Sequence, residues 1–117
     1  MPTFKAYVYL HQAEENGSIV ETSEDIVFEA ESLLDAVKAT KRYADRRLTL
    51  FPDEYIRFSC LKIKEIKNSI DKQGYIVTTT TPEGSAEWKY DRETFQEFID
   101  RLEYQKYNWE KYRAGLS

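Results

Sequence analysis

The sequence predicts a single α+β domain over residues 1–117, in which a mostly antiparallel sheet of four or five strands packs against two helices, in the order ββαβββα. Three observations predict this class. Five segments alternate in polarity or are rich in β-branched residues, two segments repeat apolar residues at helical spacing, and turn residues separate several of them. A chain of 117 residues has the ordinary size of one domain and can bury enough surface to fold without a disulfide or a metal.

A β-hairpin is predicted at the start of the chain. Segment 4–10 alternates between two faces, as a strand does. The side chains expected on its less apolar face are Lys5, Tyr7 and Tyr9. An Asn-Gly pair at 16–17 is a strong turn signal, because both residues tolerate positive φ. A second strand is expected over 18–30, and its polar run 21–25 predicts a bend or a bulge.

The first helix is predicted over 33–48. Ser32 is a suitable N-cap, and Asp35 lies in the first turn, where the helix dipole favours an anion. Apolar and small residues recur on one face at helical spacing, at Leu33, Val37, Thr40, Ala44 and Leu48. Pro52 is expected to end the helix, because the residue before a proline avoids the α conformation.

Three further strands are predicted after the first helix. In the strand expected over 55–67, the apolar positions change phase between Cys60 and Leu61, which indicates a β-bulge. Segment 75–81 is rich in β-branched residues, which suit a pleated sheet. A short strand is expected over 86–90, and turns containing Gly or Pro precede both of these last strands.

A second helix is predicted over 91–114, with Asp91 as its N-cap. Its apolar residues form one stripe, made by Phe95, Phe98, Ile99, Leu102 and Trp109. We expect the first four to pack on the sheet and the first helix, against Leu33, Val37, Val8, Phe58 and Val77.

The residues needed for catalysis or metal binding are scarce. The only histidine, His11, is expected on the surface at the end of a strand, and the only cysteine, Cys60, is expected to be an inert strand residue. One Cys and one His cannot supply a tetrahedral structural metal site, and four glycines form no phosphate-binding loop. We therefore predict no catalytic residue, no metal and no cofactor, and we predict that the protein is not an enzyme.

A basic stripe on the first helix is a candidate anion-binding site. Lys38, Arg42 and Arg46 lie opposite the apolar face of the helix, at i, i+4 and i+8, and Lys41 and Arg47 flank them. Such a stripe can bind phosphate groups, nucleic acid or an acidic protein surface. The alternative is a solvated helix face, with cations favoured near the C-terminus by the helix dipole.

The end of the second helix is a candidate partner-binding surface. At about 1.5 Å per residue the predicted helix is about 36 Å long, whereas strands of seven or eight residues give a sheet only about 25 Å deep. The residue types enriched at interface hot spots concentrate beyond Leu102, up to which the apolar stripe is dense, at Tyr104, Tyr107, Trp109, Tyr112 and Arg113. The alternative is that these aromatic residues close over the edge of the sheet.

These observations favour a non-catalytic binding protein that acts through protein–protein contact. Its partner would be another protein or a second copy in a homodimer, as for a small adaptor, an antitoxin or a phage-encoded (viral) inhibitor of a host defence system. The alternative is binding of nucleic acid or a phosphorylated small molecule through the basic face of the first helix. No membrane-spanning or signal segment is recognisable, and a single cysteine suits the cytoplasm, so we expect a cytoplasmic protein without membrane contact.

Overall fold

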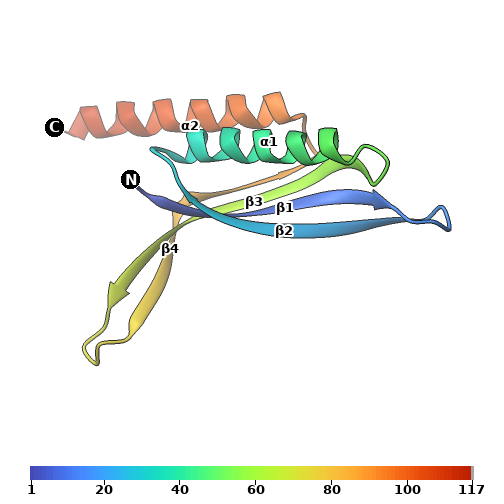
Figure 1. Cartoon of the computed structure of the whole chain (residues 1–117). Coiled ribbons are helices and arrows are strands. Elements are labelled where there is room, and N and C mark those ends of the chain that lie inside the picture. Colours follow the sequence, from blue (N-terminus) through green and yellow to red (C-terminus); the bar gives the residue numbers. More distant parts are fainter. Residues whose placement is uncertain (117) are drawn as a thin grey trace.

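The computed structural model describes the backbone of residues 1–116 and the side chains of residues 1–79 and 84–106. Its elements in chain order are β1 (Thr3–Ala13), β2 (Ile19–Glu29), α1 (Leu33–Leu50), β3 (Tyr55–Ile70), β4 (Ile76–Lys89) and α2 (Phe95–Leu116). The strands form one antiparallel sheet in the order β2-β1-β3-β4, and both helices lie on the same face of it (Figure 1). The predicted α+β class is confirmed, and the last two predicted strands are the two halves of β4.

The hydrophobic core lies between the sheet and the helices. It is built from alternate residues of β1 and β3, from β4 and from the inner faces of α1 and α2, with Phe4, Ala6, Val8, Leu10, Phe58, Leu61, Ile63, Trp88, Ala36, Val37, Ala44, Phe98, Ile99 and Leu102 all buried. The predicted packing of α2 on the sheet is confirmed for Phe98, Ile99 and Leu102, with Phe95 half-buried beside them. The prediction for Val77 is wrong, because this residue is 38% exposed, far along β4 from the helices.

β2 is a regular strand, contrary to the bend predicted from its polar run 21–25. All eleven of its residues pair in unbroken register with β1, from Thr3 opposite Glu29 to Ala13 opposite Ile19. The polar residues fit this strand because every second one lies on the face away from the helices, where water solvates it.

The predicted β-bulge in β3 is present but displaced. The register with β1 shifts between Tyr9 and Leu10, which pair with Cys60 and Phe58, so Ser59 is the extra residue. The bulge therefore returns Phe58 and Leu61 to the buried face and leaves Cys60 on the opposite face beside Tyr9.

The first helix begins where the sequence predicts and ends two residues later, at Leu50. The Ser32 hydroxyl accepts a 3.1 Å hydrogen bond from the backbone N–H of Asp35, which confirms the N-cap. Phe51 is the C-cap, and its N–H donates to the Arg47 carbonyl before Pro52 prevents continuation.

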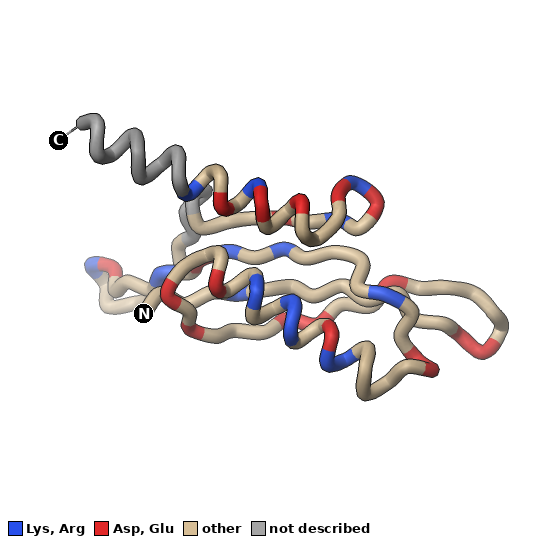
Figure 2. The backbone as a smooth tube through the Cα atoms, turned by 90° about the horizontal axis from the view of Figure 1, so that it is seen from above, with Lys and Arg blue, Asp and Glu red and all other residues tan. Residues whose placement is uncertain are grey.

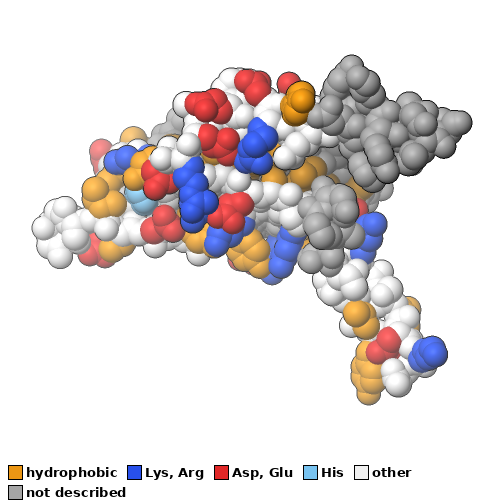
Figure 3. All heavy atoms as spheres, turned by 180° about the vertical axis from the view of Figure 1, so that it is seen from behind, with side chains coloured by type: hydrophobic (Ala, Val, Ile, Leu, Met, Phe, Trp, Pro, Cys, Tyr) orange, Lys and Arg blue, Asp and Glu red, His pale blue; other side chains and the backbone are white. Residues whose placement is uncertain are grey.

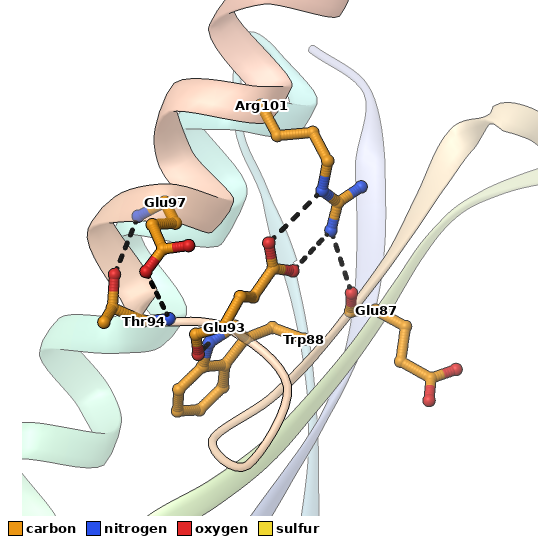
Figure 4. A network of polar contacts seen from close by, with 6 residues as sticks. All are labelled: Glu87, Trp88, Glu93, Thr94, Glu97 and Arg101. Atoms are coloured by element: carbon orange, nitrogen blue, oxygen red, sulfur yellow. Dashed lines mark hydrogen bonds and ion pairs between the residues drawn. The ribbon is translucent and has the colours of Figure 1, made fainter.

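The second helix begins at Phe95, so Asp91 is not its N-cap. Thr94 is the cap: its hydroxyl accepts from the Glu97 N–H at 3.1 Å, and the Glu97 carboxylate accepts from the Thr94 N–H at 3.4 Å. This is the reciprocal capping box that Thr-x-x-Glu encodes. Arg101 bonds Glu93 at 2.7 Å and the Trp88 indole N–H donates to the Glu93 carbonyl, which fixes this end of α2 to β4 (Figure 4).

The far ends of β3 and β4 leave the body of the protein as a two-stranded arm, which we define as residues 67–79. The arm bends away from the helices, toward the uncovered side of the sheet (Figure 1). The bend follows a register shift in which Lys64 pairs with Ser85 but Ile66 pairs with Thr80, so that β4 holds extra residues opposite Glu65. The radius of gyration is 17.0 Å, against about 13 Å for a compact domain of this length.

Candidate functional site

Two surfaces of this fold are candidates for binding: the arm and the uncovered face of the sheet. The arm ends in a turn stabilised by Asp71, whose Oδ1 accepts backbone N–H groups from Gln73 and Tyr75, each at 2.9 Å. Gly74 adopts φ 87°, which a residue with a side chain rarely adopts. The turn therefore has a defined geometry that holds the two strands of the arm in register.

The tip of the arm exposes large apolar side chains beside the charged residues of its turn. Four large hydrophobic side chains are exposed within eight residues, namely Ile70 (74%), Tyr75 (71%), Ile76 (76%) and Val77 (38%). Ile70 and Ile76 are Cα partners across the two strands, so they form one continuous apolar pair. A second group of exposed hydrophobic side chains lies within residues 50–56, between the end of α1 and the start of β3.

The sequence pattern did not indicate a binding surface in the arm. The β-branched run 75–81 reads equally as a buried strand, and the prediction placed Val77 in the core. The prediction of short strands is also wrong: strands of seven or eight residues were expected, but β3 and β4 have 16 and 14 residues, so their far ends extend beyond the helices (Figure 1).

We define the open face as the side of the sheet that neither helix covers. Its central side chains come from alternate positions of β1 and β3, namely Lys5, Tyr7, Tyr9, His11, Cys60, Lys62 and Lys64. The two tyrosines were predicted on this face of the first strand, and the structure confirms that they are only half-buried there. Basic and hydrophobic side chains lie next to one another along the lower edge of the body in Figure 3.

Lysine ammonium groups surround the two tyrosine rings of the open face. Lys62 Nζ lies 5.5 Å from the centroid of the Tyr9 ring. Lys5 and Lys64 lie over Tyr7, at 5.3 and 5.9 Å. These are cation–π distances, so the face combines aromatic rings with positive charge.

A hollow near the end of β1 is lined by polar groups of the open face and its edges. His11 is 16% exposed in its side chain, which corrects its prediction as a surface residue, because the edge of Tyr90 packs on it at 5.3 Å. Its Nε2 lies 3.5 Å from the Glu21 carboxylate, which also accepts the Ser59 hydroxyl at 3.1 Å.

The hollow contains two nucleophilic groups, the Ser59 hydroxyl and the Cys60 thiol. The Ser59 hydroxyl donates to the Glu21 carboxylate rather than to His11, so the hollow contains no Ser–His hydrogen bond. Burial, and secondly the negative charge of Glu87, raise the pKa of the Cys60 thiol, which favours the unreactive protonated form. Within the described side chains, no group of three His, Cys, Asp or Glu is placed to hold a metal ion.

The basic residues of α1 are spread along the helix (Figure 2). Lys41 forms an ion pair with Asp45 at 2.5 Å, and Lys38 lies 4.0 Å from Glu103 of α2. Arg42 and Arg46 are exposed and form no ion pair with any side chain that the structure describes. Two of the four predicted anion-binding residues are therefore already matched by carboxylates.

The predicted partner surface at the end of α2 lies mostly outside the described side chains. Tyr104 is described, and it is 67% exposed as a contact residue would be. The remaining residues of this prediction are outside the described residues: Tyr107, Trp109, Tyr112 and Arg113.

Comparisons of the chain with protein-family models, with curated proteins and with solved structures found no match. None of the helices, as far as their residues are described, has the length and hydropathy to cross a membrane. The arm and the open face are therefore the features of this protein that bear on its function.

Proposed function

We propose that this is a non-catalytic binding protein that inserts its arm into an apolar cleft of another protein. The observation that carries the proposal is the apolar tip formed by Ile70, Tyr75, Ile76 and Val77 on a hairpin that projects from the body.

The energetics of the arm favour a partner. An isolated two-stranded hairpin is marginally stable in water, and every residue from 67 to 79 except Asp71 is exposed. Exposed side chains such as Ile70 and Ile76, 74% and 76% accessible, would gain about 25 cal/mol for each Å² that a partner covers. Binding would therefore stabilise the arm and bury its apolar pair in one step.

The shape of the arm favours a different protein over a second copy. A two-fold contact uses the same patch twice, and two projecting tips meeting each other bury little area. A stable interface buries about 800 Å² on each partner. A narrow arm reaches such an area when a cleft encloses it on several sides. Small adaptors, antitoxins and phage-encoded inhibitors of host defence are the classes of protein that we expect to act by such a contact. One unpaired cysteine fits a cytoplasmic partner.

The test compares capture of proteins from the source cells by the wild type and by an Ile70→Ser/Ile76→Ser variant. A matched control is Ile19→Ser/Val27→Ser, which removes two exposed hydrophobic side chains from β2, 55% and 58% accessible. The proposal expects a protein that is captured by the wild type and the control but lost with the arm variant. Capture that the arm variant retains would rule out the arm.

Sedimentation velocity on the same three proteins distinguishes the second copy from a different partner. We expect the purified wild type to sediment as a monomer. A wild-type dimer that the arm substitutions dissociate would instead make the arm a self-association element. A dimer that survives the substitutions would favour self-association through the end of α2, where Tyr104 is exposed.

A second candidate function is anion binding by α1, of nucleic acid or a phosphorylated small molecule. Arg42 and Arg46 support it, because they lie at i and i+4 on an exposed face and have no described carboxylate partner. Charge reversal of both arginines would remove such a site, and this variant is included in the experiment described below.

A further inference from the structure

We propose that the open face binds single-stranded nucleic acid, with Tyr7 and Tyr9 stacking on two bases and Lys62 and Lys64 contacting phosphates. The arm and the open face present different side chains, so this inference goes beyond the proposed function and does not depend on it.

The two tyrosines are placed as a stacking platform. They lie two residues apart on β1, a central strand with β2 on one side and β3 on the other. Both rings are half-buried, so neighbouring strands restrict them while part of each ring faces solvent. Four-stranded sheets with exposed aromatic residues bind RNA by stacking bases in this manner.

The spacing of the two tyrosine rings favours single-stranded nucleic acid over a duplex. Side chains at i and i+2 of a strand are about 6.7 Å apart, roughly twice the ~3.4 Å rise between nucleotides in a duplex strand. Bases on Tyr7 and Tyr9 would therefore have to be pulled apart from one another. A single strand allows this, whereas a duplex would have to lose its pairing and stacking.

The lysines of the open face that have no carboxylate partner lie beside these two rings. Lys62 and Lys64 form no ion pair with any carboxylate among the described side chains. Lys62 is the Cα partner of Tyr7, and its ammonium lies 5.5 Å from the Tyr9 ring. A backbone running along β3 would meet both ammonium groups while its bases reach β1.

On binding, nucleic-acid bases would replace the lysine ammonium groups that lie over the two tyrosine rings. In the free protein, the Nζ atoms of Lys62 and Lys64 lie over Tyr9 and Tyr7. Base stacking on an aromatic ring contributes more to binding than an exposed cation–π contact does. The long lysine side chains can then swing from the ring to a phosphate without movement of the backbone.

The acidic residues of the face lie on its edge strands. Asp25 and Glu21 are on β2, where they pair with Lys5 at 3.6 Å and with His11 at 3.5 Å. Glu87 on β4 pairs with Lys89 at 3.6 Å. A net charge of −4 is therefore compatible with local positive charge at Lys62 and Lys64 on β3, because these carboxylates of the edge strands β2 and β4 already pair with other basic residues.

The experiment measures fluorescence anisotropy of short labelled oligothymidylate and oligouridylate at low salt. The wild type should bind both and bind a duplex more weakly. A Tyr7→Leu/Tyr9→Leu variant should bind at least about tenfold more weakly, since loss of one stacked base alone weakens binding roughly five- to 150-fold. Tyr7→Phe/Tyr9→Phe keeps the rings and should retain binding, so it separates loss of stacking from loss of the fold.

Two charge-reversal variants with equal change in net charge locate the phosphates. Lys62→Glu/Lys64→Glu should weaken binding at least about tenfold and lower the slope of log affinity against log salt by about 1.4, at about 0.7 per phosphate contact. Arg42→Glu/Arg46→Glu distinguishes the open face from α1: binding through the open face predicts unchanged affinity for the single strand, whereas the candidate site on α1 predicts its loss. Near-ultraviolet circular dichroism confirms that each variant is folded.

Several results would overturn the inference. They are absence of wild-type binding at low salt, tighter binding of a duplex, and unchanged affinity in the leucine or the Lys62/Lys64 variant. Loss of binding in the Arg42/Arg46 variant alone would place the anion site on α1. The Ile70→Ser/Ile76→Ser variant should bind oligonucleotide as the wild type does, so failure of the arm proposal and failure of this one are distinguishable.

Discussion

The hydroxyl of Tyr43 on α1 donates a 2.5 Å hydrogen bond to the carboxylate of Glu24 on β2, which joins the first helix to the outermost strand of the sheet. Arg47, one turn later, bonds the other oxygen of the same carboxylate at 2.7 Å. This charged contact lies on the helix-covered side of β2, where Glu24 is only partly exposed. It belongs to the fold rather than to either binding surface.

Tyr43→Phe should lower the free energy of unfolding by about 1.5–3 kcal/mol, the range for a hydrogen bond to a charged group. Chemical denaturation at neutral pH measures it. Tyr104→Phe is the control, because Tyr104 is 67% exposed and has no described hydrogen bond. Equal stability of the two variants would mean that the Tyr43 hydroxyl contributes nothing to the fold.

The contribution of Tyr43 should also depend on pH. The hydrogen bond to Glu24, and then burial, raise the pKa of Tyr43 above its ordinary value of 10.0. A group whose pKa is higher in the folded state stabilises the fold fully below its unfolded pKa, and loses that contribution as the pH rises through its folded pKa. The stability difference between wild type and Tyr43→Phe should therefore be constant near neutrality and shrink above about pH 10.

Phe98→Ala should lower the free energy of unfolding by about 3–5 kcal/mol, as truncation of a large core side chain does. Phe98 is completely buried, and its ring packs on Phe95 at a centroid distance of 5.6 Å. Tyr104→Ala, on the same helix, should change stability by less than about 0.5 kcal/mol. A loss below about 1 kcal/mol in urea unfolding of Phe98→Ala would show that the core collapses into the space.

Thr94→Ala should destabilise the protein by about 1 kcal/mol, because it removes the side-chain oxygen that caps α2. Asp91→Ala is the matched control, since Asp91 precedes the helix by four residues and does not cap it. Thermal unfolding of the two variants tests the assignment. A larger loss for Asp91→Ala would restore the cap that the sequence predicted.

Cys60 should react slowly with iodoacetamide in the native protein near pH 8, because burial and Glu87 raise its pKa and leave little thiolate. Glu87→Gln removes the second of these causes and should accelerate alkylation modestly at the same pH. In denaturant both proteins should react at the same faster rate. Rapid alkylation of the native wild type would contradict the burial of this thiol.

Some features were predictable from local sequence because they depend on neighbours in the chain. The alternation of segment 4–10 fixed which residues of β1 face the core, since successive strand side chains point to opposite faces. Ser32 was predictable as an N-cap because a cap bonds the backbone only three residues later, here at Asp35. The Thr94 cap is also predictable from Thr-x-x-Glu before Phe98, whereas Asp91 lies too early in the chain to cap this helix.

The bulge at Ser59 and the regular course of β2 could not be predicted from neighbouring residues in the chain. A phase change in the apolar pattern indicates a bulge, but the register with β1 decides which residue is extra. The polar run 21–25 of β2 suggested a bend, yet alternate polar residues are tolerated on a face that nothing covers.

The sequence by itself determined the class of the fold, the helices, most strand positions and the two faces of β1. Only the tertiary structure decided which face of the sheet stays uncovered and that residues 67–79 leave the body as an arm. The physical reason is that a period of two residues sorts side chains into two faces without saying where the helices dock. Exposure of Tyr7 and Ile76 follows from that docking, and from how far β3 and β4 extend beyond it.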